Sequence, residues 1–262
     1  MEESIVLLGI TIIKLLFVVE NLMLPKHPVP MQALFLDCFL VNFGVKPEAV
    51  ASYLPKGLVP ELHHGEAYIS VVIAKLEKMR PAFLPKFFGI TYNQVVYRLV
   101  VNKDGERGVY FLRSDADNTL MCFLGNMFSY FKFHRANIDI VNSQNRLEFL
   151  LKGIDSDDAN IHANFDIAGA SLELPATSKF QSLDEAKIFL VELFTAFGCV
   201  PNGKRTNRVS IKRGEWQVSL VADHCAEYNY LQSGLFFPAG NCRLDSVFYV
   251  QSIPYYWNKL EH

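Results

Sequence analysis

Residues 94–113, QVVYRLVVNKDGERGVYFLR, carry the strongest local structural signal in the chain. Two runs rich in β-branched and aromatic residues, 94–101 and 108–113, flank the polar segment Asn102-Lys103-Asp104-Gly105. Glycine adopts positive φ angles at little steric cost, so this segment is suited to a tight turn. The stretch therefore predicts a β-hairpin.

Further strand-like runs lie on both sides of this hairpin. Each combines β-branched, aromatic and other apolar residues. The runs cover residues 67–74, 136–141, 147–152, 161–167, 209–212, 216–222 and 246–253. The short polar connection between the runs at 136–141 and 147–152 favours an antiparallel meander.

Helical patterns interrupt the strands at two places. A separate short helix is expected to begin at Pro47, earlier in the chain. In the first pattern, apolar residues recur every three or four positions, and Asp115 or Asp117 can cap the first turn. We expect this helix to end near Lys132. Its apolar positions are Leu120, Phe123, Leu124, Met127, Phe128 and Phe131. Asp115, Asp117 and Asn118 also resemble the start of a calcium loop, but the required Gly and distal Glu are missing, which favours capping.

The second pattern begins with a capping box formed by Ser182 and Glu185 and ends at Gly198, where a C-terminal cap belongs. Its apolar stripe consists of Ala186, Phe189, Leu190, Leu193, Phe194 and Phe197. Such a helix covers a sheet with its apolar side. The chain is thus expected to be mainly β (α+β), an antiparallel sheet with a few covering helices.

Composition narrows the classes of partner and compartment. The 262 residues carry 25 basic and 27 acidic side chains, a net charge of -2, so there is no excess of cations to bind a nucleic-acid backbone. The five cysteines show neither a C-x-x-C pair nor zinc-ligand spacing, which fits reduced thiols in a cytoplasmic protein. The oligomeric state is left open by the sequence.

An apolar segment, residues 5–19, precedes the strands and is interrupted only by Lys14. It is shorter than the ~20 residues that cross a bilayer, and it lacks the basic start and cleavage site of a signal peptide. A buried helix or strand, a membrane-touching anchor, and residues upstream of the natural start remain open. Prolines at 25, 28 and 30 then indicate an extended linker. We expect residues 1–31 to be this segment and linker, and residues 32–262 to form one domain.

Common catalytic signatures are missing. The sequence has no G-x-S-x-G elbow, phosphate-binding loop, G-x-G-x-x-G or H-E-x-x-H, so no cofactor is expected. His63 and His64 are interpreted as a surface loop and not a metal site, because neighbours rarely point at one ion and no third ligand has helpful spacing. His224 and Cys225, adjacent in a strand, would face opposite sides, which disfavours a nucleophile-base dyad.

Lys132 is the candidate nucleophile, because it lies in an aromatic-rich bend, Ser129-Tyr130-Phe131-Lys132-Phe133-His134-Arg135. A lysine amine attacks a ketone only when neutral, and a dry pocket or a nearby cation lowers its pKa. His134 and Arg135 could be those cations. The alternative is a lysine whose charge favours a helix C-terminus and whose stem covers aromatic rings.

Several motifs in order resemble the YqjF-like branch of the acetoacetate decarboxylase superfamily. They are Leu54-Pro55-Lys56-Gly57-Leu58, Ala67-Tyr68-Ile69-Ser70-Val71-Val72, Arg80-Pro81, Gly108-Val109-Tyr110-Phe111, Ser114-Asp115-Ala116-Asp117 and Ser182-Leu183. The resemblance spans residues 32–257. It implies an antiparallel β-barrel with covering helices and an apolar interior pocket for a small keto or carboxylic acid.

The resemblance also implies where a catalytic lysine would lie. The true decarboxylases carry a Gly-aromatic-Pro-Lys-Lys motif whose first lysine forms a Schiff base, and Lys132 matches that position. This chain has Ser129, Phe131 and Phe133 where the motif has Gly, Pro and the second lysine. Near the position of the decarboxylase glutamate it has only Tyr92, Asn93 and Gln94.

Three functions follow as hypotheses. The first is a small-molecule-binding barrel without proven catalysis, in which Arg98 or Lys132 pairs with a carboxylate. The second is a decarboxylase-like lyase, in which Lys132 forms an imine with a β-keto acid. The third is a peripheral membrane protein that uses residues 5–19. The expected ligand-binding residues are Tyr92, Gln94, Arg98, Tyr130, His134 and Arg135.

Overall fold

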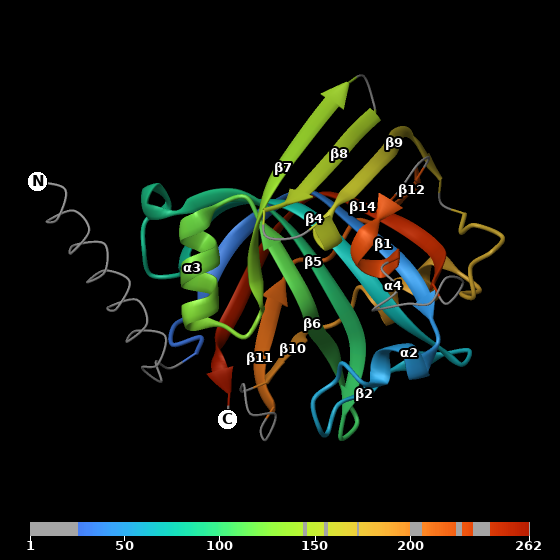
Figure 1. Cartoon of the computed structure of the whole chain (residues 1–262), viewed down its shortest axis with the longest axis horizontal. Coiled ribbons are helices and arrows are strands. Elements are labelled where there is room, and N and C mark those ends of the chain that lie inside the picture. Colours follow the sequence, from blue (N-terminus) through green and yellow to red (C-terminus); the bar gives the residue numbers. More distant parts are fainter. Residues whose placement is uncertain are drawn as a thin grey trace, which may run out of the picture.

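The computed structural model describes residues 26–143, 146–154, 157–171, 173–199, 206–223, 227–232 and 242–261 (Figure 1). Its strands are β1 (Met31–Val45), β2 (Val59–Pro60), β3 (Leu62–His63), β4 (Glu66–Pro81), β5 (Ile90–Lys103), β6 (Glu106–Ala116), β7 (Phe133–Ser143), β8 (Arg146–Gly153), β9 (Ile161–Ser171), β10 (Thr195–Cys199), β11 (Thr206–Arg213), β12 (Ser219–Asp223), β13 (Glu227–Tyr228) and β14 (Cys242–Glu261). Its helices are α2 (Pro47–Ala51), α3 (Thr119–Phe128), α4 (Leu183–Leu190) and α5 (Asn229–Gln232), with short 3-10 turns η1 (Lys86–Phe88) and η2 (Asp157–Ala159).

The strand pairings close into a ring. Starting from β6, the hydrogen-bonded neighbours run β5, β4, β1, β14, β11 and β10, and β10 pairs with β6 again. Most pairs are antiparallel, but β10 and β7 each run parallel to β6. The expected mainly β, barrel-like architecture with few helices is therefore confirmed, with a mixed sheet in place of a purely antiparallel one.

A second layer branches from this ring. β7, β8 and β9 pair in sequence, and β9 returns through β12 to β14. Figure 1 shows β7, β8 and β9 side by side above the ring, with α3 beside it. The strands of the ring that lie beneath this second layer are consequently covered on both faces.

Alternation along β5 separates two buried cores. Tyr92 and Val100 belong to the core inside the ring, whereas Val95, Tyr97 and Leu99 belong to the core under the second layer. Successive side chains of a strand point to opposite faces, so a strand buried on both faces is apolar almost continuously. This is why residues 94–101 show so little polar alternation.

The predicted hairpin is confirmed as β5 and β6. Lys103 pairs with Glu106, so the loop is two residues long, and both Asp104 (φ +52°) and Gly105 (φ +89°) lie in the left-handed region. Two positive φ angles characterise the type I′ turn, whose twist matches that of the paired strands. The Asn102 side chain accepts a hydrogen bond from the Gly105 amide at 2.9 Å.

The bounds of the first long helix differ from the prediction. Its cap is Asn118, which accepts from the Met121 amide at 2.9 Å, and not Asp115 or Asp117. It ends at Phe128, because the chain turns back at once into β7. Asn126 holds that return by accepting from the Phe133 amide and donating to its carbonyl, both at 2.8 Å.

The second long helix is also shorter than predicted. Ser182 caps it as expected, accepting from the Glu185 amide at 3.1 Å, but the helix ends at Leu190 and not at Gly198. Phe197 and Gly198 instead lie in β10, which fills the place between β6 and β11. Closing the ring outweighed the helical periodicity, a tertiary effect that local patterns do not encode.

The predictions for residues 5–19 concern a segment outside the described residues. Within the described ranges, no helix is both long and apolar enough to cross a membrane. His224 and Cys225 also lie outside them.

Candidate functional site

A cavity of about 440 Å³ lies inside the ring. Its wall comes from β1, β4, β5, β6 and β14, from α3 and the segment that follows it, and from residues 27–29 before β1. Arg80 and Phe88 line the cavity and are partly or largely exposed, whereas Ala74 and Arg98 line it and are buried. The volume lies in the range typical of small-molecule pockets.

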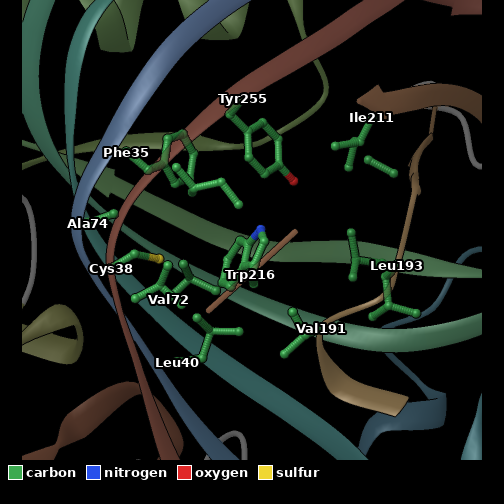
Figure 2. Close-up of a cluster of buried hydrophobic side chains, with 14 of the residues drawn as sticks. Phe35, Cys38, Leu40, Val72, Ala74, Val191, Leu193, Ile211, Trp216 and Tyr255 are labelled. Atoms are coloured by element: carbon green, nitrogen blue, oxygen red, sulfur yellow. The ribbon is translucent and has the colours of Figure 1, made fainter. Parts of the chain in front are cut away.

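Every second residue of the long strands faces inward, and most of these inward residues are apolar. β4 contributes Val72, Ala74 and Leu76, and β14 contributes Tyr255 and Trp257. Figure 2 shows Phe35, Val72, Trp216 and Tyr255 gathered around this interior. An apolar wall of this kind strengthens any electrostatic interaction made inside it.

Arg98 is the buried cation of the cavity. Its side chain is 7% exposed, and one terminal amine donates to the Leu190 carbonyl at 2.8 Å. Its Nε has no hydrogen-bond partner, and no described carboxylate lies within ion-pair distance. Burial lowers the pKa of Arg98 to about 10, which leaves it charged at neutral pH.

Other polar groups accompany Arg98. The indole Nε1 of Trp216 is buried without a partner, and the guanidinium of Arg213 lies 4.8 Å from the Trp216 ring. The Tyr92 hydroxyl donates to Gln94 Oε1 at 3.3 Å. Burial raises the pKa of both Tyr92 and Tyr255, so both hydroxyls stay neutral donors. Unpaired buried donors are costly, and an anionic acceptor would satisfy them.

The described residues that line the cavity carry no negative charge. Among the described residues that line it there is no Asp or Glu, while Arg80 and Arg98 are cations. Burial, reinforced by neighbouring Lys26, lowers the pKa of His27 to about 4, so this histidine is neutral at pH 7. The arrangement is an apolar pocket with a net positive charge.

Lys132 lies outside this pocket. Its side chain is exposed, and its Nζ donates to the Tyr110 hydroxyl at 3.0 Å. The flanking Phe131 and Phe133 line the cavity instead. Lys132 has a φ of +53°, in the left-handed region, at the bend between α3 and β7, so strand alternation does not apply here; the bend leaves the amine outside the cavity while both flanking rings line it. The expected dry setting for the Lys132 amine is therefore not what the structure shows.

The other predicted ligand-binding residues divide in the same way. Tyr92, Gln94 and Arg98 line the cavity together, as alternate residues of β5. The remaining three do not line it: His134 and Arg135 are exposed, and Tyr130 packs on the backbone at Gly198. The expected roles of these residues stay predictions.

The cavity residues that sequence reasoning missed include His27, Trp216 and Tyr255. His27 lies in a linker-like segment, and the other two lie in or beside predicted strands with no motif around them. Alternation along residues 246–257 was the one signal that could have placed Tyr255 on an inward face.

Two suggested motifs have structural explanations. Asp115 is buried and forms an ion pair with Arg113 Nε at 2.8 Å. Asp117 accepts from the backbone and side-chain amides of Asn93, at 2.9 and 2.8 Å. The Asp115 ion pair lies within β6, whereas Asp117 ties β5 to the segment between β6 and α3.

Solved structures share this fold. A structure of acetoacetate decarboxylase has a TM-score of 0.59 and 12% identity, covering 92% of this chain and 96% of that one. The enduracididine biosynthesis enzyme MppR, solved with pyruvate, has a TM-score of 0.58 and 13% identity over 92% of each chain. Acetoacetate decarboxylase from Legionella pneumophila gives 0.55 and 12%, covering 91% and 90%. Identities this low show a common fold only.

Sequence comparison identifies the family. Uncharacterized protein YqjF of Bacillus subtilis (strain 168) is 22% identical over 179 residues, which is 68% of this chain and 72% of that protein. The model of the DUF2071 family, described as an uncharacterized conserved protein, matches residues 33–254. The resemblance to the YqjF-like branch is confirmed, and the chain belongs to the DUF2071 family.

Proposed function

We propose that this protein binds a small carboxylic or keto acid with an apolar tail inside the ring, and that Arg98 holds the carboxylate. The observation that carries the proposal is a buried guanidinium, 7% exposed, whose Nε is unpartnered in a cavity without a described acidic lining residue. Removing such a charge from water is costly unless it is paired, so the site favours an anion.

The apolar wall and the volume of the cavity favour an acid with an apolar tail. A heavy atom occupies about 30 Å³ if it packs like liquid water, so a three-carbon keto acid fills roughly 180 Å³ and an eight-carbon acid roughly 300 Å³. The cavity offers about 440 Å³ with apolar walls. Acids longer than pyruvate are therefore the better fit.

Thermal unfolding with octanoate tests the proposal. A ligand at 100 times its Kd stabilises a protein by about 2.7 kcal/mol, which for a chain of this size raises Tm by about 5 to 10 °C. We expect this rise for the unmodified protein with octanoate, a much smaller rise with 1-octanol, and no rise with octanoate for Arg98→Met. Lys132→Met is the matched control and should respond fully. Equal responses of Arg98→Met and the unmodified protein would contradict the proposal.

The decarboxylase-like lyase remains the alternative proposal for the same fold. An imine at Lys132 would need its amine uncharged and beside the bound acid, since only the neutral amine is a nucleophile. The exposed position of Lys132 and its contact with Tyr110 support binding over imine chemistry. Asn93 and Gln94, next to Tyr92 in the chain, are neutral amides in place of the decarboxylase glutamate.

Contact with a lipid surface is a second candidate, favoured by one feature beside the cavity. Phe83, Phe87 and Phe88 are 72%, 74% and 58% exposed, the exposed Lys86 directly precedes Phe87, and the exposed Lys78 lies five residues before Phe83. Exposed apolar side chains flanked by cations suit an anionic lipid surface. Sedimentation with anionic vesicles should be reduced by Phe87→Ser with Phe88→Ser, and deletion of residues 1–22 tests the separate contribution of the apolar segment.

A further inference from the structure

The turn between β3 and β4 brings two histidine rings together. His63 pairs with Glu66, so His64 and Gly65 form a two-residue loop, with φ angles of +46° and +79°. Because His64 is in the left-handed region and not in a strand, strand alternation does not separate its ring from that of its neighbour. The two ring centroids are 4.4 Å apart at 83°.

Surrounding aromatics fix the ring of His63. It stacks on Phe180 with a centroid separation of 4.3 Å at 17° and lies 5.3 Å from Phe189. Its side chain is only 14% exposed, so the expected surface loop describes His64 but not His63. The buried Nε2 of His63 has no hydrogen-bond partner.

A third ligand group comes from α4, far away in the sequence. Glu185 Oε1 lies 3.7 Å from His63 Nε2. Its other oxygen, Oε2, accepts from the Gln181 amide, which anchors the carboxylate. One nitrogen of each histidine and an oxygen of Glu185 all lie within 4.8 Å of one another.

From this juxtaposition we propose that His63, His64 and Glu185 form a divalent transition-metal site, best suited to Zn²⁺. Two imidazoles and a carboxylate are a donor set that Zn²⁺ accepts, with a fourth tetrahedral position left for water. Zinc ligands lie ~2.0–2.2 Å from the ion, so ligand atoms of a loaded site are closer to one another than 4.8 Å. The exposed His64 ring can supply this closure by rotating about its side-chain bonds.

Metal binding here would tie the turn before β4 to the start of α4. The other end of α4 reaches the ligand cavity, because Arg98 donates to the Leu190 carbonyl and Arg107 donates to the Phe189 carbonyl at 3.0 Å. The metal would therefore stabilise the helix that positions the buried cation. Its expected role is structural support of α4, independent of which acid the cavity binds.

Calorimetric titration of Zn²⁺ into the metal-stripped full chain tests the site. We expect one ion per chain, and binding weaker by roughly 100-fold or more in His64→Ala and Glu185→Gln, since even partners outside the coordination shell are worth about 10- to 100-fold. Glutamine keeps the helix cap, so loss of binding in Glu185→Gln would not reflect loss of α4.

His162 provides the matched control. Its Nε2 lies 3.1 Å from Glu148 Oε1, the same pair of residue types, and both residues are exposed. His162→Ala should bind Zn²⁺ like the unmodified protein. Titration with Co²⁺ should give visible d–d bands without a thiolate charge-transfer band. Absence of Zn²⁺ binding, unchanged binding in His64→Ala and Glu185→Gln, or a thiolate band accompanying the bound ion would overturn the proposal.

Discussion

Replacing Arg98 with methionine should leave the protein as stable as before or more stable, although the residue is buried. Burial lowers the pKa of Arg98 to about 10, and one pKa unit corresponds to about 1.4 kcal/mol, so keeping the charge buried costs roughly 3 kcal/mol. Methionine removes this cost and fills a similar volume, but it leaves the Leu190 carbonyl without its donor. Leaving this carbonyl unpaired costs about 2 kcal/mol, which offsets part of the gain. The expected net change is between zero and about 2 kcal/mol of added stability.

Urea unfolding at pH 7 without ligand measures this difference. Val100→Ala is the control, because Val100 is fully buried and points from β5 into the same core as the cavity. The free energy of unfolding of Val100→Ala should fall by about 2 kcal/mol, the usual cost of creating a cavity in a core. Because folding lowers the pKa of Arg98, the cost is present at every pH below about 10 and shrinks above it. If Arg98→Met lowers the free energy of unfolding by more than about 2 kcal/mol, the folded protein already satisfies this guanidinium. That result would refute the proposal that Arg98 is an unpaired cation suited to an anionic ligand.

Three further outcomes are expected. Burial lowers the pKa of His27 to about 4, whereas the unfolded chain takes up this proton near pH 6.5. Between pH 7 and pH 4, the free energy of unfolding of the unmodified protein should therefore fall by about 3 kcal/mol more than that of His27→Phe. Equal decreases in urea unfolding would exclude this. Gly125→Ala should destabilise by about 1 to 3 kcal/mol, because a Cβ there would lie 2.4 Å from the Phe133 ring, whereas Gly214→Ala, with open space, should be nearly neutral in thermal unfolding. Borohydride reduction with acetoacetate should give no mass adduct on Lys132, and an adduct abolished by Lys132→Ala would restore the imine hypothesis.

Local patterns in the sequence determined most of the secondary structure. The hairpin of β5 and β6 follows from a glycine turn between two β-rich runs, and the Ser182 cap follows from a capping box. Both signals involve residues a few positions apart, so the atoms that interact are already neighbours in the chain. Tyr92, Gln94 and Arg98, three of the inward residues of β5, likewise share one face because side chains alternate along any strand.

Only the tertiary structure decided what these elements enclose. Residues 195–199 join the sheet because a place between β6 and β11 has to be filled to close the ring, although their apolar spacing continues that of α4. Lys132 lies outside the cavity, while Phe131 and Phe133 line it, because the chain bends between α3 and β7 with Lys132 in the left-handed region (φ +53°). Glu185 meets His63 across more than a hundred residues of chain. Such contacts depend on how strands close and helices dock over long sequence distances, which no local spacing records.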